Sequence, residues 1–249
     1  MSLLECAVIL LAGVAAGTIN TVVGSGTLIT FPTLLAFGVP PVTANVSNTL
    51  GLVPGSVSGA IGYRAHLTGQ RTRILRLVVA TLVGSAIGAT LLLVLPSSAF
   101  KAIVPVLILV GLLLVVLGPR ISARAAAAAD GSAPDAPWVP PAVLGAGVYG
   151  GYFGAAQGVI VLGIFGAGVH ESLQRQNAVK NVVVASSNSL AAVIFTFSGH
   201  MDWLIVALLA VGAATGGQIG ARVGQKLPPN VLRAVIVVVG LVALVSFLL

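Results

Sequence analysis

The stretch Gly17-Thr18-Ile19-Asn20-Thr21-Val22-Val23-Gly24-Ser25-Gly26-Thr27 interrupts an apolar run near the start of the chain. The stretch Gly150-Gly151-Tyr152-Phe153-Gly154-Ala155-Ala156-Gln157-Gly158 interrupts a second apolar run, early in the other half. We name Gly24-Ser25-Gly26 the first break and Gly154–Gly158 the second break. In membrane proteins, helices interrupted at matching points of two halves are the best pointer from sequence to a binding site.

The composition indicates that lipid is the solvent of this chain. Of its 249 residues, 57% are hydrophobic and only 7% are charged, and the mean hydropathy is +1.12. A soluble domain carries about 25% charged residues, so this chain has too few to cover a water-facing surface. We therefore expect an all-α protein that crosses the bilayer several times. The net charge is +7, and the basic residues lie in short gaps between apolar runs. This distribution is typical of the positive-inside rule and not of nucleic-acid binding.

Apolar runs of about 20 residues, the length that spans a bilayer as a helix, divide the chain into two similar parts. The first part, 1–118, is expected to contain a broken segment and three long helices, at 5–38, 43–63, 74–95 and 99–118. Residues 119–141 are rich in Ala and Pro and predict a flexible cytoplasmic linker. The second part, 142–249, is expected to repeat the pattern, at 142–169, 178–197, 204–222 and 231–248.

The order of matching residues indicates an internal repeat. A constant shift superposes Gly17 on Gly151, Gly24 on Gly158 and Phe31 on Phe165. When the shift is made two residues shorter, Gly84 aligns with Gly216 and Gly88 with Gly220. Glycines spaced by four residues on one helix face are typical of close helix packing in membranes, and we interpret these pairs in that way.

Basic residues predict that the two repeats are inverted relative to each other. Residues 64–76 contain four arginines, which favours a cytoplasmic loop. The equivalent loop of the second repeat, 198–203, has no Lys or Arg, whereas 222–233 contains three basic residues. The loops rich in Lys and Arg therefore occupy different positions in the two repeats, as expected if the repeats have opposite orientations in the membrane. In this topology both termini are outside. The alternative is eight ordinary helices in two parallel halves. The short pieces 27–38 and 159–169 either return to their own side or cross.

Polar residues of the breaks and of the third segments could form a site within the membrane. A half-helix that begins at a break directs its positive N-terminal end into the cavity, which suits an anion. In the third segments, Asn45 and Asn48 share one helix face, as do Lys180 and Asn181. Such a stripe is either interhelical glue or a substrate path, and Lys180 either attracts an anion or snorkels to the surface. The candidate substrate-binding residues are Gly24, Ser25, Gly26, Thr27, Asn45, Asn48, Tyr152, Gly154, Gln157, Lys180, Asn181 and Asn188.

The sequence argues against an enzyme. Its five acidic residues lie near predicted helix ends or in loops, so no carboxylate proton relay is expected in the membrane. Neither a metal-ligand spacing nor a nucleotide-binding motif is present, and we expect no metal and no cofactor. Cys6 is the only cysteine, which excludes an intrachain disulfide.

At the same residues the chain resembles the TauE/SafE family of sulfite and organosulfonate exporters. The matching elements in the first half are Phe31-Pro32-Thr33-Leu34-Leu35 and Ala44-Asn45-Val46-Ser47-Asn48-Thr49. In the second half they are Gly147-Val148-Tyr149-Gly150-Gly151-Tyr152-Phe153-Gly154, Asn177-Ala178-Val179-Lys180-Asn181 and Ser198-Gly199-His200-Met201-Asp202-Trp203. The resemblance implies a multi-pass permease of the inner membrane that exports small anions such as sulfite, sulfoacetate or taurine-derived sulfonates. The first break has fewer glycines than the family pattern.

Together these observations predict a secondary transporter of a small anion that alternates between two repeats. The alternative is an anion channel in which the breaks form the filter. The expected partners are the lipid bilayer and a small anionic substrate, and no nucleic acid. The coupling ion, the direction of transport and the oligomeric state, with a homodimer among the options, stay open at this point.

Overall fold

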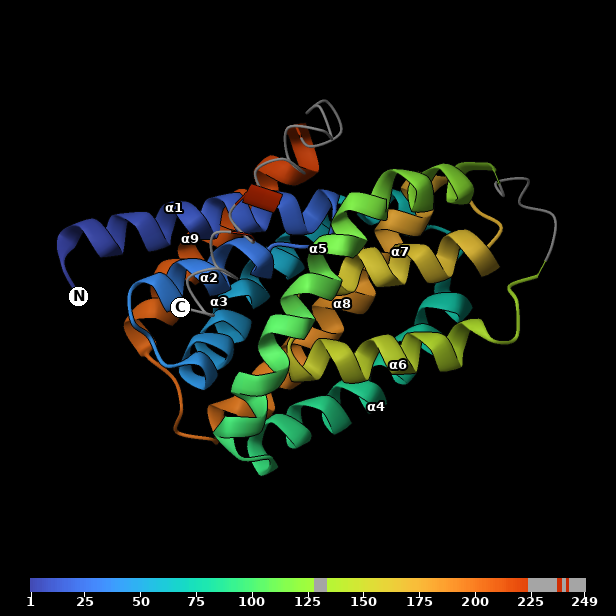
Figure 1. Cartoon of the computed structure of the whole chain (residues 1–249). Coiled ribbons are helices and arrows are strands. Elements are labelled where there is room, and N and C mark those ends of the chain that lie inside the picture. Colours follow the sequence, from blue (N-terminus) through green and yellow to red (C-terminus); the bar gives the residue numbers. More distant parts are fainter. Residues whose placement is uncertain (128–133, 224–236, 239–240, 242–249) are drawn as a thin grey trace.

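The computed structural model describes residues 1–127, 134–223, 237–238 and 241, and over this part of the chain the regular structure is all helical (Figure 1). The helices are α1 (Leu3–Val22), α2 (Thr27–Ala36), α3 (Pro41–Gly62), η1 (Arg64–Leu67), α4 (Arg71–Val94), α5 (Ser97–Ala127), α6 (Val139–Tyr152), α7 (Gln157–Gly168), α8 (Leu173–Thr196) and α9 (Trp203–Val223). Five of them, α1, α4, α5, α8 and α9, are long and apolar enough to cross a membrane. The all-α, multi-pass prediction is therefore confirmed.

The first break lies where the sequence predicts it, because α1 ends at Val22 and α2 begins at Thr27. The second break comes earlier than expected, since α6 ends at Tyr152 and α7 begins at Gln157. Gly154 with φ +76° and Ala156 with φ +59° turn the backbone out of the helical conformation there. Gly158, which we placed at the break, lies in the first turn of α7.

The predicted linker is shorter than expected at both ends. Helix α5 continues past residue 118 to Ala127, because this stretch is rich in alanine, the strongest helix former. Helix α6 starts at Val139, since Pro140 and Pro141 are tolerated in a first turn, where the backbone N–H needs no helical partner. The predicted last helix, 231–248, falls outside the described residues except at 237–238 and 241.

Each broken segment folds as a hairpin. In Figure 1, α2 lies beside α1 and leads back towards the end at which α1 begins. In the second hairpin the backbone N–H of Ala136, just before α6, donates to the carbonyl of Gly168 at the end of α7 over 2.8 Å. The short helices have 10 and 12 residues, too few for a span of about 20. The second short piece thus returns to the side from which its segment came.

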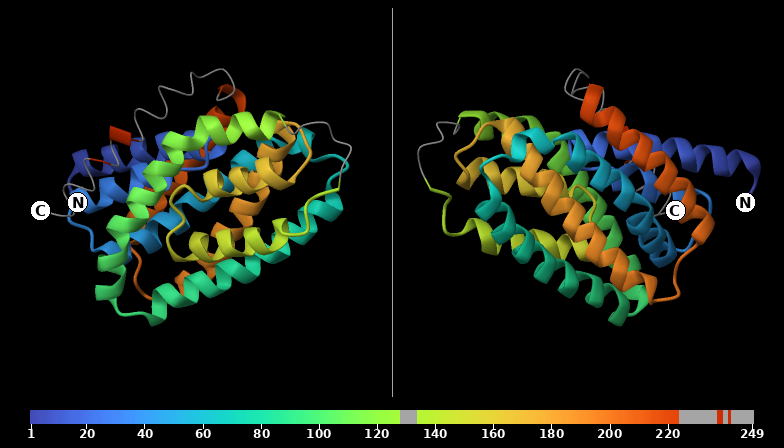
Figure 2. Two further views of the ribbon diagram at one scale, coloured as in Figure 1. Left: turned by 45° about the vertical axis from the view of Figure 1, so that its right-hand side comes forward. Right: turned by 180° about the vertical axis from the view of Figure 1, so that it is seen from behind.

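Glycines bring two pairs of helices into backbone contact, α1 with α9 and α4 with α6 (Figure 2). A Cβ atom built on Gly17 would lie 2.3 Å from the carbonyl oxygen of Ala213, and one on Gly88 would lie 2.0 Å from that of Val148. The interpretation of these glycines as close-packing residues is confirmed. Each pair joins the first segment of one half to the helix after the third segment of the other half, so the two halves are interlocked.

Ion pairs connect the loops at one end of the bundle. Arg73 donates two hydrogen bonds of 2.7 Å to Asp135 and one of 3.1 Å to Glu171, which also pairs with Arg175 at 2.6 Å. Burial raises the pKa of Glu171, but its hydrogen bonds and charge interactions with Arg175 and Arg73 outweigh burial and leave that pKa below its ordinary value. The arginine-rich loop 64–76 and the residues before α6 therefore lie at the same end, as expected if both are cytoplasmic.

The glycine contacts predict opposite effects for two substitutions in α6. In Gly151→Ala the new Cβ would lie 2.2 Å from the Ser85 carbonyl oxygen, whereas in Gly145→Ala it meets no atom within 4 Å. We expect Gly151→Ala to destabilise the protein by about 2 kcal/mol through overpacking. The control, Gly145→Ala, should be neutral or stabilising by up to about 1 kcal/mol. Thermal unfolding of both variants in detergent measures this, and equal melting temperatures would contradict the close α4–α6 contact.

Candidate functional site

The two breaks meet in the interior of the protein. The backbone N–H of Gly158 donates to the carbonyl oxygen of Gly24 over 3.1 Å. A Cβ atom on either glycine would lie 2.5 Å from the Cα atom of the other. Gly24 also has φ +90°, a conformation that side chains rarely allow. We call this contact the crossing, and it joins the two positions that the internal repeat superposes.

Two helix N-termini begin beside the crossing. Helix α2 starts at Thr27 and α7 at Gln157, and neither has a side-chain N-cap, because Gly26 and Ala156 occupy the cap positions. The N-terminus of a helix carries a partial positive charge of about +0.5. Backbone carbonyls accept from several of the first N–H groups, among them that of Gly158, but no side chain caps either end. Both half-helices therefore begin, with their positive ends, near the point where the two halves touch.

The C-termini of α1 and α6 are capped by side chains of the opposite half. From α8, Lys180 donates to the carbonyl oxygens of Asn20 at 3.3 Å and Thr21 at 3.2 Å. From α3, Asn45 donates to the carbonyl oxygen of Tyr152 at 3.0 Å. Lys180 is 0% exposed, so the snorkelling alternative is wrong for this residue.

Three further candidates, Thr27, Asn48 and Asn188, form two junctions between helices. The Nδ2 atom of Asn48 donates to Thr27 Oγ1 at 3.3 Å, and the Thr30 hydroxyl donates to Asn48 Oδ1. These bonds hold α2 on α3, which favours interhelical glue for Asn48 and Thr27. The other junction consists of Asn20 and Asn188, which both donate to the hydroxyl oxygen of Ser56, at 3.1 and 3.3 Å.

Sequence reasoning missed Ser56, Asn20 and the aromatic residues around Tyr152. Asn20 lies in the stretch that defines the first break, and its polar side chain one turn before Gly24 was the available signal. Tyr152 packs edge-on against Phe100, with ring centroids 5.7 Å apart, and Phe31 packs against Phe153 at 5.1 Å. Phe31 belongs to α2 and Phe153 lies directly after α6, so this pair, distant in sequence, packs α2 against the end of α6.

Several buried polar atoms in these elements have no hydrogen-bond partner among the described residues. They are Ser25 Oγ, Asn45 Oδ1, the Tyr152 hydroxyl, Gln157 Oε1, Asn177 Oδ1 and Asn181 Nδ2. Buried polar side chains nearly always have a partner in native proteins, and each exception requires a functional or structural reason. These six lie in or next to the breaks, or in the third segments, whereas three further such atoms, Thr81 Oγ1, His170 Nδ1 and Gln176 Oε1, are outside the candidate set. The region thus combines hydrogen-bond donors and acceptors that are available to a ligand.

The charges of this region do not cancel. The α2 and α7 N-termini offset the two C-termini that face them, at about half an elementary charge each, and the Lys180 ammonium remains. No acidic side chain of the described residues lies inside the bundle, because Glu5, Asp135, Glu171 and Asp202 lie near helix ends or in loops. A buried cation without a counter-charge is costly. The arrangement therefore suits one negative charge.

Comparison with known proteins identifies relatives along the whole chain. The family model described as sulfite exporter TauE/SafE matches residues 9–247. A probable membrane transporter protein of Sinorhizobium sp., ORF9, is 26% identical over 246 residues, covering 97% of this chain and 92% of the relative. The probable membrane transporter protein YfcA of Escherichia coli K12 is 27% identical over 236 residues, covering 94% and 86%. One of Haemophilus influenzae is 25% identical over 232 residues, covering 93% and 90%. No solved structure matches the chain.

The crossing predicts that alanine is tolerated at Gly38 better than at Gly24. Both glycines have positive φ, +76° and +90°, but a Cβ on Gly38 meets no atom within 4 Å. Gly38→Ala should cost only the backbone strain of about 1–2 kcal/mol. Gly24→Ala adds the clash with Gly158 and should lower the melting temperature further, or prevent folding. Matched melting temperatures for the two variants would show that the two breaks do not touch.

Proposed function

The chain belongs to the sulfite exporter TauE/SafE family and is a multi-pass membrane transporter, and on this premise we propose that it is a secondary transporter of a small sulfur-containing anion. Sulfite or an organosulfonate is the proposed substrate, and export across the inner membrane is the proposed direction. Sulfite export is part of the family description, whereas the relatives are named only as membrane transporters.

The observation that carries the anion proposal is the burial of Lys180, whose amino group lies at the C-terminus of α1, just before the first break. The partners of Lys180 are two neutral carbonyl oxygens, which compensate a buried charge less well than an anion does. Ser25 Oγ and Asn181 Nδ2, both buried and unpartnered, supply further donors in the same elements. One sulfonate or hydrogen sulfite group could accept hydrogen bonds from these three side chains and from backbone N–H groups.

We propose that transport involves two units that each contain helices from both halves. In one unit, Gly51 and Gly55 of α3 pack on Leu209 and Ala213 of α9, which also contacts α1. In the other unit, α4 contacts α6, and Ser85 of α4 donates to the Ser187 carbonyl of α8 at 2.8 Å. Close-packed backbones resist sliding. We therefore propose motion of unit α1, α3, α9 against unit α4, α6, α8, as an alternative to the motion of one repeat against the other that the sequence suggests.

The hydrogen bonds between these units come from the candidate site. They are the bonds of Lys180 and Asn177 to α1, of Asn45 to Tyr152, and of Asn188 to Ser56. A substrate that replaces some of these bonds would favour a different relative position of the two units. Alternating access requires such a coupling between binding and conformation. The inverted relation of the repeats is part of this proposal, and the equivalent α1–α9 and α4–α6 contacts support it.

Substitution of Lys180 tests the anion site. Lys180→Gln removes the buried charge, and we expect the apparent affinity for the transported anion to fall at least tenfold. Lys180→Arg retains the charge and should recover part of the affinity. The matched control is Lys101→Gln, which removes an exposed lysine at the start of α5. Binding measured on variants that melt normally decides the question, and unchanged affinity in Lys180→Gln would overturn the assignment of Lys180.

Counterflow in proteoliposomes tests the substrate class and the mode of transport. We expect labelled sulfite uptake to saturate and to be driven by internal sulfite, sulfoacetate or taurine, with thiosulfate as a further competitor. Saturable exchange is a property of a carrier with a limited number of substrate sites. Conductance that does not saturate would instead support an anion channel that uses the breaks as its filter. Transport of an unrelated cation or sugar, with no response to any of these anions, would refute the anion proposal.

A further inference from the structure

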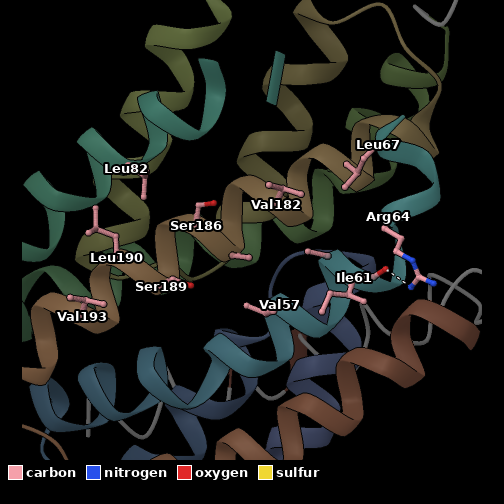
Figure 3. A pocket seen from close by; sticks show the side chains of 12 residues that line it. Val57, Ile61, Arg64, Leu67, Leu82, Val182, Ser186, Ser189, Leu190 and Val193 are labelled. Atoms are coloured by element: carbon pink, nitrogen blue, oxygen red, sulfur yellow. Dashed lines mark hydrogen bonds between the residues drawn. The ribbon is translucent and has the colours of Figure 1, made fainter. Parts of the chain in front are cut away.

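A groove of about 590 Å³ lies between α3, α4 and α8, on a different face of α8 from Lys180 (Figure 3). None of the twelve candidate substrate-binding residues lines it. Its lining residues are Val57, Ala60, Ile61, Arg64, Leu67, Leu82, Val182, Ala185, Ser186, Ser189, Leu190 and Val193. With one charged side chain among aliphatic ones, the groove is unsuited to a small anion alone.

Small side chains leave the space that forms the groove. Ala60 on α3 and Ala185, Ser186 and Ser189 on α8 are the small lining residues, and Ala185 is buried. Larger residues stand at its edges, where Val57 is 40% exposed, Ile61 50% and Val193 57%. In a membrane-embedded bundle, exposed aliphatic side chains face lipid tails. The groove is thus an apolar slot open to the hydrocarbon core.

One end of the slot carries a positive charge that no acidic residue of the described chain neutralises. Arg64 begins η1, directly after α3 ends, and Figure 3 shows its guanidinium at that end of the groove. Arg64 donates a long hydrogen bond from Nη1 to the Ile61 carbonyl, at 3.4 Å. In contrast, Arg73 and Arg175, at the same end of the bundle, are held in ion pairs. A guanidinium has five N–H donors, which suit a phosphate group.

We propose that this groove binds a phospholipid with an anionic headgroup, its acyl chain between α3 and α8 and its phosphate at Arg64. The loop that contains Arg64 is the arginine-rich loop 64–76, and cytoplasmic leaflets carry the anionic lipids that attract such residues. The acyl chain gains contact with the small residues of the slot, and the phosphate gains a charged partner. Both ends of one lipid molecule are thus recognised.

The lining favours a lipid over a helix from a second copy of the chain. Helices associate in membranes through small residues that bring two backbones together, because lipid tails give no hydrophobic driving force. Here Val57, Ile61 and Val193 project at the edges and would hold a second helix away from the small residues at the bottom. An acyl chain is thin enough to pass between them.

The position of the groove gives the bound lipid a structural consequence. Helix α3 belongs to the unit with α1 and α9, and α8 belongs to the unit with α4 and α6. A lipid in the groove contacts both units at once, at a distance from the crossing.

Native mass spectrometry of the purified full chain, titrated with phosphatidylglycerol or phosphatidylcholine, tests the proposal. We expect one phosphatidylglycerol to bind more tightly than phosphatidylcholine. Arg64→Gln should weaken phosphatidylglycerol binding about fivefold, the effect of one basic residue near an anionic lipid. It should weaken phosphatidylcholine less, because the choline cation of that lipid offsets its phosphate charge. Ser189→Leu fills the slot and should weaken both lipids. Arg71→Gln, which removes an exposed arginine outside the groove, is the matched control.

Three outcomes would overturn the proposal. Equal losses in Arg64→Gln and Arg71→Gln would mean that general surface charge attracts the lipid. Unchanged binding in Ser189→Leu would place the acyl chain elsewhere. A dimer that dissociates in Ser189→Leu without any change in bound lipid would assign the groove to a second copy. Thermal unfolding of each variant ensures that only folded protein is compared.

Discussion

The contact between Gly24 and Gly158 is the constraint on which the rest of the structure depends. Two backbones that approach until no Cβ fits fix where both hairpins turn and therefore where α2 and α7 begin. In a bilayer, freed backbone groups cannot turn to water and must find partners inside the protein. The crossing solves part of this problem directly, because the Gly158 N–H donates to the Gly24 carbonyl. The remaining groups at the helix ends determine the chemistry nearby.

Caps from the opposite half satisfy the helix C-termini and create the charge that the proposed function uses. At the C-terminus of α6 the cap is a neutral donor, because the Asn45 side-chain amide binds the Tyr152 carbonyl oxygen. At Asn20 and Thr21 the donor is an ammonium, so a structural requirement for a cap also introduces a buried positive charge. In the proposed function, the anion would compete with helix capping for the N–H groups of Lys180. Such competition links occupancy of the site to the contact between the two units.

Local features of the fold were predictable from sequence, and contacts between distant segments were not. Two glycines flank a polar residue at Gly24-Ser25-Gly26, so the first break was predicted closely, and the spacing of Gly84 and Gly88 indicated a packing face. The partner of that face was not predictable, because any helix with small residues fits it; the structure pairs α4 with α6. Lys180 could have snorkelled by its length alone. Only the placement of the α1 carbonyls within its reach decides that it is buried.

The repeat is symmetric in its backbone and asymmetric in its polar side chains, and this difference explains why a single charge is present. The alignment that superposes Gly24 on Gly158 places Val46 opposite Lys180 and Val179 opposite Asn45. Both C-termini are capped, but from neighbouring positions and with different chemistry. Likewise Thr27, Thr30 and Asn48, which join α2 to α3, correspond to Val161, Ile164 and Val182. Two symmetric lysines beside one crossing would repel each other and require two anions. With one lysine, the site that we propose would take one negative charge.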